Sequence, residues 1–189
     1  MTAVRLRAAF VAASIAWAVL LVAVPYAAGQ PHVSRTAAAL IAAVYTVGSL
    51  VCHQLPERSY HLWTAQMPVC ARCAGIYFGA VLGAIAASIR TAKVVRHNRG
   101  EVVRTARAVR HSRKVAQGFS PASAVVGVFN PAWTPRVALA AAVAPTIVSL
   151  AYEWTTGDTP SHAIRAAAGV PIGVVVAWLI VAATDNQVN

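Results

Sequence analysis

Three cysteines and two histidines lie within one short segment of this chain, residues 52–73. Cys52-His53 is followed by sixteen residues and then by Cys70-Ala-Arg-Cys73, with His61 between them. Thiolates and imidazoles are the ligands that Zn²⁺ and other soft divalent metals prefer, in tetrahedral geometry. The segment therefore predicts a metal site made by Cys52, His53, Cys70 and Cys73. His61 is the alternative to His53, because two adjacent side chains rarely reach the same ion comfortably.

The same residues also permit thiol–disulfide chemistry. The Cys70–Cys73 pair comes where an apolar helix should begin, next to Arg72. A helix N-terminus and a neighbouring cation both favour a thiolate. Cys52 would then act as a third, resolving thiol. A purely structural role, as a disulfide or as buried thiols, is the third alternative, and the spacing alone leaves all three open.

Charged residues near the cysteines are the candidates to orient them. A ligand histidine usually donates its second N–H to a carboxylate or another acceptor, and Glu57 is the candidate for that role. Arg58 and Arg72 are the candidate cations around the ligands. Two acids and a cation further along the chain flank the turn before the last apolar span. Charges at a membrane edge are usually interface anchors; the functional alternative is that Arg165 pairs with one of the two acids beside the cysteine loop. These are Glu153, Asp158 and Arg165.

The composition is that of a membrane protein. Of 189 residues, 58% are hydrophobic, 11% are charged and only five are acidic. This excludes a disordered chain and argues against a soluble globular enzyme. Five apolar segments are long enough to approach the length of a membrane span: residues 8–28, 36–52, 73–89, 137–152 and 166–184. The first is long enough to be a retained helix rather than a cleaved signal peptide.

We therefore predict an all-α, polytopic transmembrane helix bundle of about five spans. The Cys/His loop lies between the second and third spans, and residues 1–189 form a single membrane domain. Glycines at four-residue spacing in the third and fifth spans predict close helix packing: Gly75, Gly79, Gly83, Gly169 and Gly173.

Positive charge is concentrated between the third and fourth spans. Residues 90–136 contain ten Lys or Arg and one acid, Glu101, in a chain whose formal net charge is +11. We interpret residues 90–135 as a basic loop, an insertion that contains an interfacial amphipathic helix. A basic loop between apolar spans favours contact with anionic lipid headgroups over binding of nucleic acid.

The same charges predict an orientation in the cytoplasmic membrane. If all five segments cross, the basic loop and Arg35 place eleven cations on one side, and the cysteine loop and the N-terminus place five on the other. Cationic loops stay in the cytoplasm. The basic loop is therefore expected to be cytoplasmic and the cysteine loop to face outward.

Two strings resemble the signature of a known family. CHQLPERS and QMPVCARCAGIYFG are similar to motifs of a family of predicted bacterial and archaeal membrane proteins, domain of unknown function 2085. The residues that carry the likeness are Cys52, His53, Gln54, Pro56, Arg58, Ser59, Pro68, Val69, Cys70, Arg72, Cys73, Gly75, Ile76, Tyr77 and Gly79. A weaker similarity follows at Asp158, Arg165, Gly169 and Gly173. The resemblance implies a small multi-pass membrane protein and supplies no activity.

The leading hypothesis is an integral membrane protein that binds a zinc-type metal through a Cys/His cluster at the membrane edge. The rival is a membrane thiol–disulfide oxidoreductase that uses Cys70 and Cys73.

Overall fold

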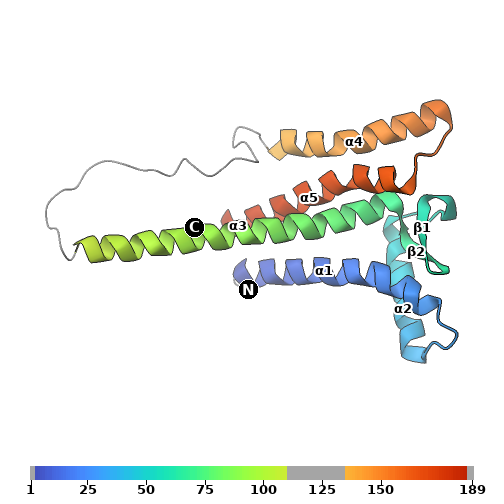
Figure 1. The fold of residues 1–189 in the computed structure, drawn as a ribbon, viewed down its shortest axis with the longest axis horizontal. Coiled ribbons are helices and arrows are strands. Elements are labelled where there is room, and N and C mark those ends of the chain that lie inside the picture. The colour runs from blue at the N-terminus through green and yellow to red at the C-terminus, as the bar shows by residue number, and fades with distance from the viewer. Residues whose placement is uncertain (1–2, 110–134, 187–189) are drawn as a thin grey trace.

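The computed structural model describes the backbone of residues 3–109 and 135–186, and the side chains of residues 4–90 and 135–184. Within these described residues, five helices, a short 3-10 turn and a two-stranded hairpin follow one another (Figure 1). Their bounds are α1 Ala3–Ala28, α2 Arg35–Val51, η1 Pro56–Arg58, β1 Ser59–Leu62, β2 Ala65–Cys70, α3 Ala71–Val109, α4 Pro135–Thr156 and α5 His162–Asn186.

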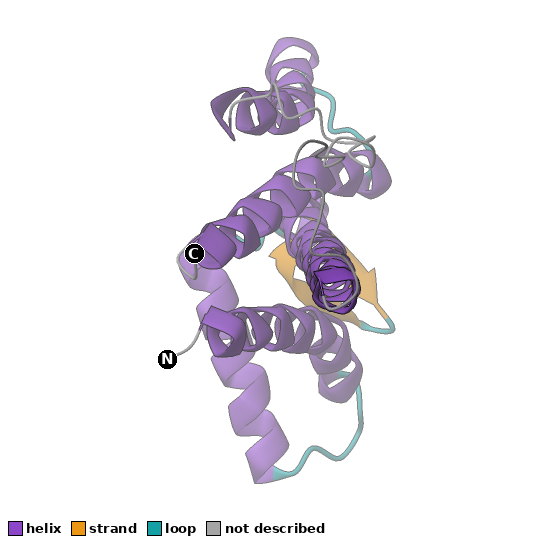
Figure 2. Cartoon of the chain, turned by 90° about the vertical axis from the view of Figure 1, so that its left-hand side faces the viewer, coloured by secondary structure: helices purple, strands orange, loops and turns teal. Residues whose placement is uncertain are grey.

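Four of the helices lie side by side in the order α1, α3, α5, α4 (Figures 1 and 2). Within the described residues, these four are long and apolar enough to cross a membrane, over Val4–Ala28, Ala71–Arg90, Pro135–Thr156 and His162–Thr184. Large apolar side chains such as Val148 and Trp154 are exposed on their outer faces, as expected for helices in lipid. The predicted helical membrane bundle is confirmed.

The second predicted span differs from the other four. Residues Arg35–Val51 form α2, which is apolar but has only 17 residues. A helix of that length covers about 26 Å at 1.5 Å per residue, less than a hydrocarbon core of about 30 Å. Figure 1 shows α2 running crosswise to α3 at one end of the bundle. Five crossings would have placed the N-terminus and the cysteine loop on the same side, as we predicted. Because only four of the described helices lie side by side, the start of α1 instead lies at the end of the bundle away from the cysteine loop.

Glycines bring α3 and α5 into backbone contact. A Cβ on Gly75 or Gly79 would collide with the carbonyl oxygen of Ala166 or Val170. A Cβ on Gly169 or Gly173 would meet the carbonyl oxygen of Arg72 or Ile76 in the same way. Small residues on both helices therefore allow the closest helix pair of the bundle, as the four-residue spacing indicates.

The loop before α3 is a β-hairpin, which the sequence did not indicate. Strands β1 and β2 pair antiparallel, with Leu62 opposite Ala65 and Ser59 opposite Cys70. The two-residue turn between them carries Trp63 at a φ of +57°, a conformation usually taken by Gly, Asn or Asp. The Trp63 ring packs edge-on against Tyr26 at the end of α1, with centroids 5.2 Å apart. This tertiary contact holds a turn that local sequence would not favour.

The basic interval is in part a continuation of α3. The helix extends from Ala71 through Val109, well beyond its apolar part, so the first half of residues 90–135 is helical. Residues 110–134, which include the rest of the interval, lie outside the described residues.

Candidate metal centre

Three sulfur atoms meet at the base of the hairpin. The Sγ atoms of Cys52, Cys70 and Cys73 all lie within 4.8 Å of one another. Cys52 is buried, and the other two are half-buried. Among the described residues, these three form a group of potential metal ligands, and the group contains no histidine.

Each cysteine comes from the end of a different element. Cys52 is the residue that ends α2, where its backbone is extended. Cys70 is the last residue of β2, and Cys73 lies in the first turn of α3. The backbone N–H of Cys70 donates a hydrogen bond to Cys52 Sγ, at 3.2 Å. An amide that donates to sulfur stabilises its thiolate form, which is the form that binds metals.

Two glutamines fasten the hairpin to α2. The side-chain amide of Gln54 donates to the carbonyl oxygens of Tyr45, at 2.9 Å, and Pro68, at 2.6 Å. Gln66 donates in return to the carbonyl oxygen of Gln54, and the Tyr45 hydroxyl donates to that of Gln66. A Cβ on Gly48 would collide with the Pro68 carbonyl, so only glycine allows this approach. These contacts fix the strand of Cys70 against the helix of Cys52.

The environment favours a thiolate at Cys70. A hydrogen bond from the Cys73 side chain is the largest influence, and it lowers the pKa of Cys70 from 9.0 to about 5. Burial raises the pKa and opposes this effect, while hydrogen bonds from the Cys73 backbone and from Cys52 lower it further. The cluster is therefore prepared to carry negative charge near neutral pH.

A cavity of about 370 Å³ opens beside the sulfurs. All three cysteines line it, together with His53, Gln54 and two apolar residues. Its remaining lining is cationic and consists of Arg58, Arg72 and Arg165. The three cysteines and the three arginines thus line one cavity.

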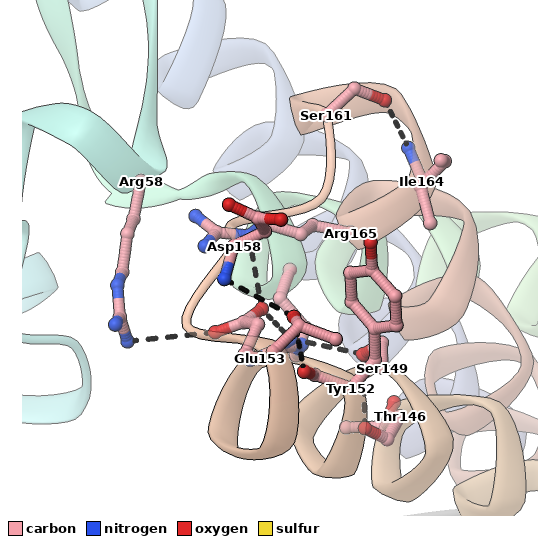
Figure 3. Close-up of polar contacts among 11 residues, drawn as sticks. Arg58, Thr146, Ser149, Tyr152, Glu153, Asp158, Ser161, Ile164 and Arg165 are labelled. Atoms are coloured by element: carbon pink, nitrogen blue, oxygen red, sulfur yellow. Dashed lines mark hydrogen bonds and ion pairs between the residues drawn. The ribbon is translucent and has the colours of Figure 1, made fainter.

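The carboxylate of Glu153 contacts all three arginines. Figure 3 shows it between Arg58 and Arg165. Oε1 of Glu153 accepts from Nη2 of Arg72, at 2.8 Å, and from Nε of Arg165, at 3.1 Å. Its other oxygen lies 3.9 Å from Nη1 of Arg58. Glu153 and Arg165 are both buried, at 8% and 2% exposed. The last turn of α4 is thereby tied to the first turns of α3 and α5.

The predicted site residues fall into two groups. The cysteines, Arg72, Arg165, Arg58 and Glu153 are brought together, and of the two acids offered as partners for Arg165 the structure uses Glu153. His53 lines the cavity but is not among the three grouped ligands. His61 is exposed and pairs with Gln66 across the hairpin. Glu57 and Asp158 are exposed.

Sequence reasoning gave no role to two residues that position the site. Gln54 docks the hairpin, and the Ser149 hydroxyl accepts from Nη2 of Arg72, at 3.0 Å. The position of Gln54 directly after Cys52-His53 could have indicated that it helps to position the site. Ser149 lies 77 residues from Arg72 in sequence and one helical turn before Glu153, which only the packing of α4 reveals.

Comparison with known proteins confirms the resemblance over the cysteine segment. Residues 52–106 match the family described as "Predicted membrane protein (DUF2085)". The match includes the first part of the interval that we interpreted as an insertion, and it does not reach Asp158 or Arg165. The uncharacterized protein MJ1492 of Methanocaldococcus jannaschii is 52% identical over 42 residues, which are 22% of this chain and 27% of that protein. The chain thus spans about a quarter of the length of this relative. No solved structure matches.

Proposed function

We propose that this membrane protein binds a zinc-type metal ion through the thiolates of Cys52, Cys70 and Cys73. The convergence of three sulfurs within 4.8 Å of one another carries the proposal. Ligands 2.3 Å from a tetrahedral Zn²⁺ are about 3.8 Å apart. Small side-chain adjustments therefore suffice to bring the three sulfurs around one ion.

The fourth position of such a site faces the cavity. Three protein ligands with an open fourth position are typical of zinc sites that bind a water or a substrate. His53 lines the same cavity and stays the predicted fourth ligand, with a water or a substrate as the alternative occupant of that position. Gln54, whose contacts fix the hairpin, orients the ligands from outside.

The surrounding charges suit a metal–thiolate centre. Zn²⁺ with three thiolates carries one net negative charge. Arg58, Arg72 and Arg165 with Glu153 supply two net positive charges around it. This arrangement offsets the cost of placing an anionic centre at the edge of an apolar bundle.

The distribution of cations favours an outward-facing centre in the cytoplasmic membrane. Among the described residues, the hairpin end of the bundle holds four arginines: Arg35, Arg58, Arg72 and Arg165. The opposite end holds nine cations: Arg5, Arg7, Arg90, Lys93, Arg96, Arg99, Arg104, Arg107 and Arg136. The cation-rich end stays in the cytoplasm and meets anionic headgroups there.

A thiol–disulfide oxidoreductase is the second candidate. It is favoured by the pKa of Cys70, which is lowered to about 5, and by the closeness of its sulfur to that of Cys73. An outward-facing pair would meet an oxidising compartment. This function requires that the thiols react rapidly in the protein as isolated and form a reversible disulfide.

Metal analysis of the purified full chain separates the two. We expect about one zinc per chain in the wild type and nearly none in Cys52→Ser or Cys70→Ser, because each removes a ligand. His61→Ala is the matched control and should keep its metal. Near-zero metal in the wild type and in both cysteine variants, with thiols that alkylate without prior chelation, would reject the metal site in favour of the redox function.

A further inference from the structure

We propose that the cavity beside the cysteines binds a phosphate-type oxyanion through Arg58, Arg72 and Arg165. This second ligand is held by guanidinium groups and not by sulfur. The proposal can therefore be tested in metal-free protein, where its failure is distinguishable from a failure of the metal site.

Each of the three arginines that line this cavity carries a buried guanidinium nitrogen without an acceptor. Among the described residues, Nε of Arg58, Nε of Arg72 and Nη2 of Arg165 are buried and have no hydrogen-bond partner. Buried donors are nearly always paired, because an unpaired one loses its hydrogen bonds to water without replacement. Arg165 is only 2% exposed and also lines the cavity. An acceptor supplied by a ligand would satisfy donors that the chain itself leaves unpaired.

The charge around the cavity is suited to an anion. Glu153 neutralises one of the three guanidinium groups, which leaves two net positive charges. Arg72 is the second residue of α3 and Arg165 the fourth of α5, so both helix N-termini point their partial positive charge toward the same region. Anions bind at such places because backbone dipoles and guanidinium groups act together.

The arrangement favours phosphate chemistry over a carboxylate. The unpaired donors come from three separate segments: the η1 turn, the start of α3 and the start of α5. A tetrahedral phosphate directs its oxygens toward several sides, whereas a planar carboxylate is matched by a single guanidinium fork. The cavity volume of about 370 Å³ also leaves room for the group that carries the phosphate.

A phosphate here has two sources. It is either a free phosphate compound or the headgroup of a phospholipid, because the cavity lies at the ends of α3 and α5, where spanning helices meet the interface. The chemistry of recognition is the same for both. Two probes, inorganic phosphate and phosphatidylglycerol, distinguish them.

The test uses the full chain, purified in a neutral detergent and treated with a chelator to remove metal. Binding of inorganic phosphate is measured by isothermal titration calorimetry, and retention of phosphatidylglycerol against phosphatidylcholine by native mass spectrometry. Arg58→Gln is the main variant, because the Arg58 side chain is 43% exposed and its loss should be tolerated. Arg35→Gln removes an equal charge at the same end of the protein but outside the cavity. Arg165→Gln, checked for folding by circular dichroism, is the second variant.

We expect saturable binding of one of the two probes, weakened about tenfold or more by Arg58→Gln and unchanged by Arg35→Gln, since one charge-assisted hydrogen bond is lost. Binding of inorganic phosphate assigns a soluble ligand, and selective retention of phosphatidylglycerol alone assigns a lipid. Equal behaviour of the wild type and Arg58→Gln toward both probes would overturn the proposal. Binding that is seen before the chelator treatment and is absent after it would also overturn the proposal, because the metal and not the arginines would then hold the anion.

Discussion

Arg72 and Glu153 lie 81 residues apart in sequence, and their side chains meet with an N···O distance of 2.8 Å. Arg72 stands between Cys70 and Cys73, so the last turn of α4 is connected directly to the cysteine motif. Glu153 also binds Arg165 of α5. One carboxylate therefore sets the relative positions of three helices around the proposed metal centre.

Replacing Glu153 should destabilise the protein strongly. Glu153→Gln removes the charge that balances Arg165, which is 98% buried, and an unbalanced buried charge costs about 3–5 kcal/mol. The free energy of unfolding, measured by denaturant titration in detergent, should fall by about 3 kcal/mol or more. Asp158→Asn, which changes an exposed acid nearby, is the control and should stay within about 0.5 kcal/mol of the wild type. Equal stability of the two variants would show that the ion-pair cluster contributes little.

The contact of α3 with α5 should not tolerate a larger residue. Gly79→Val would place its side chain against the carbonyl of Val170 and force the helices apart, at a cost of about 1–3 kcal/mol. Ala86→Val makes a similar increase in size at an exposed position of the same helix and should be nearly neutral. The free energies of unfolding of Gly79→Val and Ala86→Val, measured under the same conditions, test this prediction. A neutral Gly79→Val would mean that the two helices do not pack through this face.

The sequence was sufficient to predict the helices and the closeness of the cysteines. Hydrophobic segments bounded by charges predicted four of the spans, and glycine spacing predicted the α3–α5 contact. The crosswise placement of α2 was not predicted, because its 17 residues are as apolar as a span, and only the docking of Gly48 on Pro68 reveals its direction. The hairpin was missed for a similar reason, because its turn residue Trp63 is held by Tyr26 rather than by local preference.

Shortening Gln54 should loosen the hairpin and weaken metal binding. Gln54 has a φ of +51°, which asparagine tolerates, but in Gln54→Asn the amide would fall short of the Tyr45 and Pro68 carbonyls. Loss of two partly buried hydrogen bonds should cost about 2 kcal/mol and lower zinc affinity about tenfold. Competition with a coloured chelator measures the affinity. Gln30→Asn, at an exposed glutamine, is the matched control, and the same affinity in both variants would deny Gln54 its positioning role.

Cys70 should titrate at unusually low pH in metal-free protein. Because its pKa is lowered to about 5, its thiolate should be present above that pH and be lost by protonation below it. The absorbance at 240 nm reports thiolate and should rise around pH 5 in the wild type but not in Cys70→Ser. In Cys73→Ala the main donor is gone, so the rise should move toward the ordinary value of 9.0. A wild type whose first thiolate appears only above about pH 8 would contradict the hydrogen-bonded arrangement of the sulfurs.

Part of the candidate site follows from residue types and part only from folding. Clustered Cys and His indicated the ligands, yet neither histidine joins the three sulfurs. His61 is an exposed residue of β1, and His53 lines the cavity without entering the sulfur group. The sequence indicated two acids, Glu153 and Asp158, as possible partners of Arg165. Arg165 pairs with Glu153 because α4 packs beside α5, and no local sequence pattern predicts that packing.

X-ray absorption at the zinc edge tests the central proposal most directly. On the zinc-loaded wild type, we expect three sulfur ligands at about 2.3 Å and one nitrogen or oxygen ligand at about 2.0–2.1 Å. Cys52→Ser, treated in the same way, should retain almost no zinc and should give no sulfur-coordinated zinc signal. Zinc that is surrounded by nitrogen and oxygen alone, with no sulfur in the wild type, would contradict the proposed centre.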